Sequence, residues 1–253
     1  MLTQTLWWTT DALMACLLFR GLRGRFFSKY LIFYIYLSHV LGLELVRFLV
    51  YNFKPKAYGN FYWHTEFLSV AIGYCVIWEI YGRALAAYPG PLRMARLLVT
   101  ATFVLIVAKV FSTALSDTSW ALAQGVGELE RNLRTVQAVL LVVVLAVVNY
   151  YMIPIGRNLR GIILGYGFYI GALVVINTVW SRFGDTLHLW LQYFQPTAWL
   201  VTLLFWSATL WSYHPNPEPE GENEIERDYE LIAARTALNM AKARGYLVRA
   251  IRQ

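Results

Sequence analysis

The sequence is poor in charged residues, and this shortage narrows the class of protein. Only 15% of its 253 residues are Asp, Glu, Lys or Arg, whereas 58% are hydrophobic and 16% are aromatic. Soluble domains have a much lower apolar content, because water could not cover so much apolar surface. The composition therefore disfavours a soluble globular protein and predicts an all-α polytopic membrane protein.

Cysteine is scarce as well. Cys16 and Cys75 lie in separate apolar stretches, and their spacing fits neither a metal site nor a redox pair. We expect both to be small buried apolar residues. Zinc signatures, nucleophile elbows, phosphate-binding glycine loops and dinucleotide fingerprints are also missing. No soluble-type active site is indicated, and we expect a non-enzymatic protein without a metal centre.

The sequence implies no cofactor either. A membrane b-type haem would need axial histidines on two helices at one depth, and no other histidine matches the predicted depth of His39. A retinal Schiff base would need a lysine in the last apolar stretch, and residues 190–213 contain none. The sequence therefore does not favour either of these cofactors.

Long apolar runs are what the chain has in abundance. A helix needs about 20 apolar residues to cross a bilayer, and seven stretches reach or approach that length. The predicted spans are residues 3–20, 29–52, 61–83, 95–116, 128–152, 160–182 and 190–213. The first is expected to be a retained anchor, because its positive charges follow the apolar run instead of preceding it, as in a signal peptide.

Basic residues in the loops predict the orientation, since Lys and Arg in short loops stay on the cytoplasmic side. The loops after the first, third and fifth spans carry Arg20, Arg23, Arg25 and Lys29, then Arg83, Arg93 and Arg96, then Arg157 and Arg160. The opposite loops carry fewer. We predict an outside N-terminus and a cytoplasmic C-terminus. Much of the formal net charge of +7 is explained by this bias and by the tail, so no nucleic-acid partner is inferred.

Several predicted spans contain ionisable residues, although a charge in hydrocarbon is costly and usually functional. A rise of about 1.5 Å per residue places most of them in the outer leaflet. The predicted ligand-binding set is Glu44, Arg47, His64, Glu66, Lys109, Arg134 and Gln137. Two interpretations stay open. One is an ion-pair network that holds helices together, and the other is an outward-facing, water-accessible pocket for a small polar or anionic ligand.

The sixth predicted span has two small-xxx-small pairs, a pattern that lets helix backbones approach closely. The pairs are formed by Gly161, Gly165, Gly167 and Gly171. We expect them to pack against another helix, either inside the bundle or across a dimer.

The composition changes after Tyr213. Residues 214–222 are rich in proline and glutamate and predict a stiff linker between the domain of residues 1–213 and the tail. Residues 223–253 begin with acids and end with bases, which suits a helix dipole. An apolar stripe at helical spacing comprises Ile225, Tyr229, Ile232, Thr236, Met240, Leu247 and Ile251. We predict a cytoplasmic amphipathic helix that binds the membrane surface, the cytoplasmic loops, another protein or a second copy.

Three segments carry a resemblance to a known group. They are Tyr62-Trp63-His64-Thr65-Glu66, Leu129-Glu130-Arg131-Asn132-Leu133-Arg134-Thr135-Val136-Gln137 and the glycine-rich sixth span. With these segments, residues 1–213 resemble a group of uncharacterised seven-helix bacterial inner-membrane proteins. The resemblance implies seven helices and no established activity. It also draws Glu66, Arg131, Arg134 and Gln137 into one site in the outer layer.

These features favour a receptor-like or accessory module with an outward-facing pocket and a cytoplasmic coupling helix. A transporter or channel is an alternative, and it would need a polar path to the cytoplasm. Glu79 lies on that side, but its position four residues before Arg83 predicts a structural ion pair. A subunit of a larger membrane complex is a further alternative, motivated by the glycine face and the tail stripe.

Overall fold

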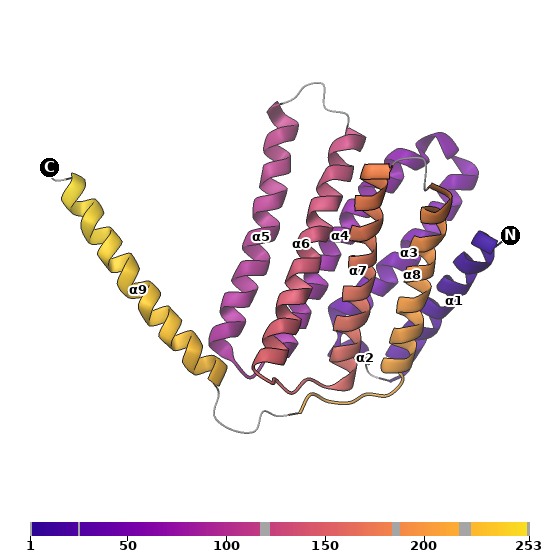
Figure 1. The fold of residues 1–253 in the computed structure, drawn as a ribbon. Coiled ribbons are helices and arrows are strands. Elements are labelled where there is room, and N and C mark those ends of the chain that lie inside the picture. Colours follow the sequence, from indigo (N-terminus) through magenta and orange to yellow (C-terminus); the bar gives the residue numbers. More distant parts are fainter. Residues whose placement is uncertain (1, 25, 117–121, 184–187, 218–223, 252–253) are drawn as a thin grey trace.

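The computed structural model describes the backbone of residues 2–24, 26–116, 122–183, 188–217 and 224–251, and the side chains of 5–24, 26–59, 61–62, 65–66, 68–108, 131–179, 193–217 and 224–243. These residues form helices and no strand, which confirms the all-α prediction for the described part of the chain. The helices are α1 (Leu2–Arg23), α2 (Phe26–Lys29), α3 (Leu31–Phe53), α4 (Pro55–Ala84), α5 (Pro89–Ser116), α6 (Leu122–Tyr150), α7 (Arg157–Phe183), α8 (His188–Thr209) and α9 (Glu224–Ile251) (Figure 1).

Four helices in the described part of the chain are long and apolar enough to cross a membrane. They are Leu31–Phe53, Pro89–Ala108, Arg131–Tyr150 and Arg157–Val179, within α3, α5, α6 and α7. They indicate a multi-pass membrane protein. The other predicted spans fall on α1, α4 and α8, and for these helices spanning stays a prediction.

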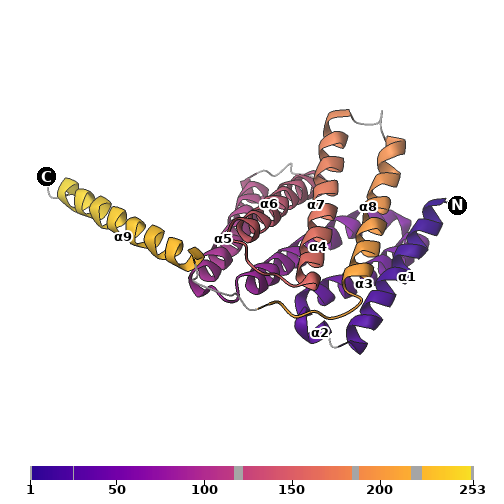
Figure 2. The same cartoon turned by 60° about the horizontal axis from the view of Figure 1, so that its bottom comes forward.

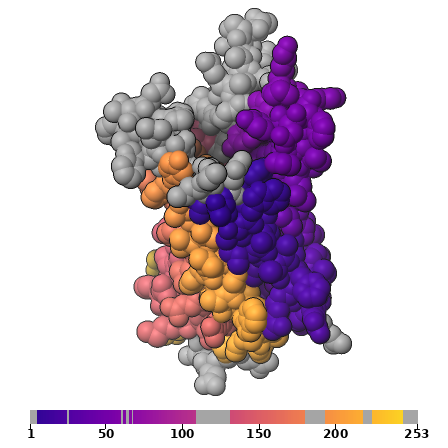
Figure 3. Space-filling view, turned by 90° about the vertical axis from the view of Figure 1, so that its right-hand side faces the viewer, coloured from indigo at the N-terminus to yellow at the C-terminus, as the bar shows by residue number. Residues whose placement is uncertain are grey.

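The long helices form one bundle. α1, α3, α4, α6, α7 and α8 pack in a closed ring in that order, and α4 also touches α7 across the ring. α5 lies outside the ring against α4 and α6. On one face of the bundle, α1 and α8 lie side by side although they are far apart in the sequence (Figure 3). The junction of α3 and α4 marks the upper end of the bundle in Figure 1, and α2 marks the lower end.

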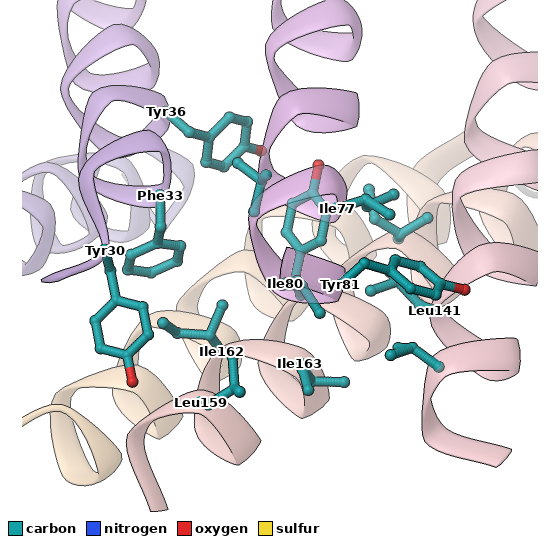
Figure 4. Close-up of a cluster of buried hydrophobic side chains, with 14 of the residues drawn as sticks. Tyr30, Phe33, Tyr36, Ile77, Ile80, Tyr81, Leu141, Leu159, Ile162 and Ile163 are labelled. Atoms are coloured by element: carbon teal, nitrogen blue, oxygen red, sulfur yellow. The ribbon is translucent and has the colours of Figure 1, made fainter. Parts of the chain in front are cut away.

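The interior of the lower half is apolar (Figure 4). Side chains from α3, α4, α6 and α7 point toward one another there, among them Phe33, Ile77, Leu141 and Ile162. Trp206 of α8 is fully buried, and its ring meets the Phe33 ring edge-on with the centroids 4.8 Å apart. This packed core fills the lower half of the bundle.

Glu79 lies at the edge of this apolar region and is held on two sides. Its Oε1 lies 3.2 Å from Nη2 of Arg83, and its Oε2 accepts a hydrogen bond from the backbone N–H of Phe33 at 2.9 Å. The guanidinium of Arg83 also lies over the Tyr30 ring at 4.8 Å. The pair predicted from the four-residue spacing is present, and it joins α4 to the start of α3.

The two cysteines correct one expectation. Cys16 and Cys75 were predicted to be buried, but both are exposed on the surface of the chain. The inward faces of their helices are formed by neighbours such as Met14 and Leu17 on α1 and Val76 on α4. Because adjacent helical residues point about 100° apart, an apolar stretch alone does not determine which residue faces inward.

The glycines of α7 have two different environments. A Cβ atom added to Gly161 would collide with Thr209 of α8, and one added to Gly165 would collide with Trp206. At Gly167 and Gly171 an added Cβ would meet nothing within 4 Å among the described residues. The close contact of α7 with α8 therefore depends on the first two glycines.

We expect Gly165→Leu to lower the free energy of unfolding by about 1–3 kcal/mol, because the added side chain overpacks the contact with Trp206. Chemical unfolding of the detergent-solubilised protein measures this change. Gly167→Leu is the matched control, since it adds the same side chain to the same helix in open space, and its effect should stay within about 0.5 kcal/mol. Equal stability of the two variants would contradict the packing argument.

α9 begins beside α5 at the lower end and diverges from the bundle (Figures 1 and 2). Its first turns are attached to the bundle. Glu226 Oε1 accepts a hydrogen bond from the backbone N–H of Gly90 at 3.2 Å, and Asp228 Oδ2 accepts one from the Tyr151 hydroxyl at 3.2 Å. Ile225, the first residue of the predicted stripe, is buried.

The rest of the described stripe is open. Residues 230–243 are exposed, including Ile232, Thr236 and Met240. These three residues line an apolar groove of about 480 Å³ between α9 and the start of α5. Within the described part of α9, the amphipathic pattern is therefore used for docking only in the first turns, and Leu247 and Ile251 of the predicted stripe have side chains outside the described residues.

Candidate functional site

A buried ion-pair network lies in the upper half of the bundle. Glu66 on α4 accepts a hydrogen bond through Oε2 from Nη2 of Arg47 on α3, at 2.9 Å. Its other oxygen, Oε1, pairs with Nη2 of Arg134 on α6. The three side chains are 11%, 11% and 6% exposed for Glu66, Arg47 and Arg134. One carboxylate thus joins three helices.

Arg47 is positioned by several further contacts. Its Nη2 donates to Thr65 Oγ1 at 2.8 Å, and the Thr65 hydroxyl lies 2.9 Å from the Phe61 carbonyl oxygen, to which it donates. The Tyr62 ring lies 4.5 Å from the guanidinium carbon, which adds a cation–π contact. Arg47 Nη1 is 3.8 Å from Glu44 Oε1. α4 therefore holds the guanidinium on two sides.

Glu44 is oriented mainly by α1. The indole N–H of Trp7 donates to Glu44 Oε2 at 2.8 Å, and the Trp7 ring packs on Phe48 with the centroids 5.4 Å apart. Trp7 was not among the predicted site residues. The signal that could have found it is the need of a partly buried indole N–H for an acceptor.

Asp11, on α1, is a further acidic residue in the same layer as Glu44. It lies one helical turn after Trp7 and is 9% exposed. Its Oδ1 has no hydrogen-bond partner among the described residues. Asp11 is also close enough to Glu44 for the two negative charges to repel each other.

Gln137 has an interhelical role in the structure. It lies one turn after Arg134 on α6, is fully buried, and donates through Nε2 to the Val70 carbonyl oxygen of α4 at 2.9 Å. It joins α4 to α6 close to the ion-pair network.

A cavity of about 140 Å³ opens beside the network. Its charged lining residues are Glu44, Arg47, Glu66 and Arg134, so their formal charges sum to zero. The other polar and aromatic lining residues include Tyr36, Tyr58, Tyr62, Ser69, Tyr169 and Trp199. An apolar protein cavity of roughly 150 Å³ can hold benzene, so this cavity has room for a comparably small molecule.

A second cavity of about 270 Å³ adjoins the first. The two share the lining residues Val40, Glu44, Tyr169, Gln195 and Trp199. The second cavity reaches α1 at Trp7, Thr10 and Met14, and α8 at Pro196. Pro196 lies inside α8, which continues through it, and it lines this cavity.

Two members of the predicted set, His64 and Lys109, have side chains outside the described part of the structure, so their roles stay predictions. Arg131, which the resemblance drew into the site, is exposed on α6. The structure therefore brings Glu44, Arg47, Glu66 and Arg134 together around the cavity. The aromatic lining residues Tyr36, Tyr169 and Trp199 were not foreseen as site residues, because aromatic residues are common in any membrane bundle.

Among the residues that the structure describes, no group of three or more His, Cys, Asp or Glu side chains could hold a metal ion. Comparison of the chain with protein-family models, with curated proteins and with solved structures finds no match.

Proposed function

We propose that the chain is a seven-span protein of a bacterial inner membrane that binds a small polar or anionic ligand from the outside. In this orientation the N-terminus and the upper end of the bundle face out, and α9 lies in the cytoplasm. The basic loop residues support it, since Arg20, Arg23 and Lys29 all belong to the lower end. We place the protein among receptor-like or accessory modules, without enzymatic activity.

The observation that carries this proposal is the pair of arginines beside an open cavity. Arg47 and Arg134 both line the cavity of about 140 Å³ and both pair with Glu66. A guanidinium presents a planar fork of N–H donors that suits carboxylate and phosphate groups. Ion pairs that only stabilise a bundle need no cavity, and a buried pair often adds little net stability because desolvation offsets attraction.

The lower half of the bundle favours a receptor over a transporter or channel. Conduction would require a polar path from the cavity to the cytoplasm, and the interior below Tyr36 is filled by apolar side chains such as Phe33, Ile77 and Ile162 (Figure 4). Glu79, which could have continued such a path, is paired with Arg83.

The geometry also suggests how binding could reach the cytoplasmic side. Glu66 lies on α4, whose lower end leads directly into α5 at Pro89. Gly90, in the first turn of α5, is the docking point of Glu226 on α9. A small displacement of α4 on ligand binding would therefore act on the attachment of α9.

A subunit of a larger membrane complex is the second candidate. It is favoured by the exposed residues 230–243 of α9 and by the groove between α9 and α5. Under this proposal the partner would be another protein or a second copy of this chain, and the cavity beside the ion-pair network would have no ligand.

We expect Arg134→Ala to weaken binding of 3,3-dimethylbutanoate, a small carboxylate probe, by about 10- to 100-fold. This factor corresponds to the free energy of one charge-assisted hydrogen bond. Titration calorimetry of the protein in nanodiscs measures this loss. Arg131→Ala is the matched control, because it removes the same charge from an exposed position one turn away on α6. Arg134→Lys keeps the positive charge and loses the planar fork of donors. It tests the same side chain in case the alanine variant does not fold. Unchanged affinity in both Arg134 variants, or no binding by the unmodified protein, would favour the complex subunit.

A further inference from the structure

We propose that the ligand is a zwitterion whose acidic group lies beside Arg47 and Arg134 and whose ammonium group occupies the second cavity. This inference rests on the proposed function, and it extends the site into a cavity to which no role has been assigned. It also names the chemical class of the ligand.

The charges along the two cavities are separated in space. The first cavity holds Arg47, Arg134 and Glu66, whereas Glu44 stands in the wall that the two cavities share. Among the described residues that line the second cavity, Glu44 is the one that carries a charge. The second cavity is therefore negative at its junction with the first. Because the formal charges of the described residues that line the first cavity, Glu44 included, sum to zero, a ligand of zero net charge disturbs the balance less than an anion does.

The walls of the second cavity suit an organic cation. Trp7, Tyr169 and Trp199 line it, and the rings of Tyr169 and Trp199 pack with their centroids 4.5 Å apart. Aromatic rings arranged around a site bind quaternary ammonium groups through cation–π attraction. The hydrogen bond from Trp7 to Glu44 fixes one ring beside the carboxylate.

Asp11 is a further acidic residue near the second cavity. Its carboxylate is nine-tenths buried, and its Oδ1 has no hydrogen-bond partner among the described residues. It follows Thr10, which lines the second cavity, but Asp11 is not itself one of the lining residues. Two neighbouring acids in a region of low dielectric are stabilised by a cation between or beside them.

A matched pair of probes tests the inference. Glycine betaine carries a trimethylammonium group and a carboxylate, and 3,3-dimethylbutanoate has the same shape with carbon in place of the charged nitrogen. We expect betaine to bind at least about tenfold more tightly than its isostere in titrations of the full-length protein, from the cation–π and ionic terms. Equal affinities would overturn the zwitterion and leave the anion pocket standing. No binding of either probe would overturn both proposals.

A variant and its control test whether the preference for betaine over its isostere arises in the second cavity. Glu44→Gln keeps an acceptor for the Trp7 indole and removes the charge, so betaine should lose its advantage and the ratio of the two affinities should fall to about one. Glu230→Gln, an exposed residue of α9, is the charge-matched control and should leave both affinities unchanged. If betaine keeps its full advantage over the isostere in Glu44→Gln, the assignment of the ammonium group to this cavity is wrong.

A zwitterion can be a free solute or the headgroup of a lipid, and the composition of the nanodisc distinguishes them. If a headgroup is the natural ligand, betaine will bind more weakly in phosphatidylcholine discs than in phosphatidylglycerol discs, because the headgroup competes with it. If the natural ligand is a free solute, the two affinities will agree. Both results support the site. The comparison between the two kinds of disc shows whether the zwitterion is a lipid headgroup or a free solute.

Discussion

Glu66→Leu is expected to lower the free energy of unfolding by about 3–5 kcal/mol, the cost of leaving buried charges without their partner. Glu66 is the shared acceptor of Arg47 and Arg134, and both guanidinium groups are nearly buried. Removing the carboxylate would leave two positive charges close together, without their shared partner, in a region of low dielectric. Equilibrium unfolding in detergent, followed by circular dichroism and intrinsic fluorescence, measures the loss.

A control and a compensating variant make the result specific. Glu44→Gln should cost less than about 1 kcal/mol, since the Glu44 side chain is 28% exposed and lies 3.8 Å from Arg47. The triple variant Arg47→Met, Glu66→Leu, Arg134→Met should recover most of the stability, because an apolar replacement of a whole buried network is often neutral. It should bind no carboxylate probe. A stable triple variant with normal binding would refute the pocket, and a mild effect of Glu66→Leu alone would show that water already reaches the network.

Trp206→Ala is expected to cost about 3–5 kcal/mol of unfolding free energy, as large-to-small substitutions in a packed interior do. The Trp206 side chain is fully buried, and its ring packs edge-on against Phe33 and Trp199 with the centroids 4.8 and 5.7 Å apart. It also covers Gly165 on α7. The substitution would open a cavity between α3, α7 and α8, and thermal and chemical unfolding would both report it.

Phe205→Ala is the matched control for this substitution. Phe205 precedes Trp206 on α8 but is 39% exposed, so its ring lies at the surface of the bundle and not in the packed interior. We expect the change to stay below about 1 kcal/mol. Similar losses in the two variants would mean that lipid contact, and not packing between α7 and α8, determines the stability of this helix.

These effects bear on the two interpretations that the sequence left open. If the charged network only held the bundle together, the cavity beside it would have no use. If it forms a binding site, the same arginines must stabilise the fold and recognise the ligand. The compensating triple variant separates these roles, because it restores apolar packing and removes the donors.

Local patterns in the sequence were enough to predict the helices and to group several polar residues at one level. Apolar runs are properties of single segments, and the rise along a helix is the same in every helix. Glu44, Arg47, Glu66 and Arg134 could therefore be placed at one level without knowledge of the fold. The structure places these four residues around one cavity.

The tertiary structure decided the rotation of each helix and the identity of its neighbours. Nothing in the spacing of Trp7 and Glu44 predicted their hydrogen bond across 37 residues. The exposure of Cys16 and Cys75 likewise depends on which face of α1 and α4 turns inward. Packing sets helix rotation through many weak contacts along the whole interface, and no short pattern records their sum.

By itself, the sequence determined that the chain is helical and apolar enough for a membrane, and that its charged residues gather toward one end of the predicted spans. Only the tertiary structure decided that Glu66 is shared by two arginines, that Gly161 and Gly165 rather than Gly167 and Gly171 lie against α8, and that two cavities meet at Glu44. The reason is physical. Helix formation and depth follow from interactions within one segment, whereas partners and cavities arise where separate segments pack together.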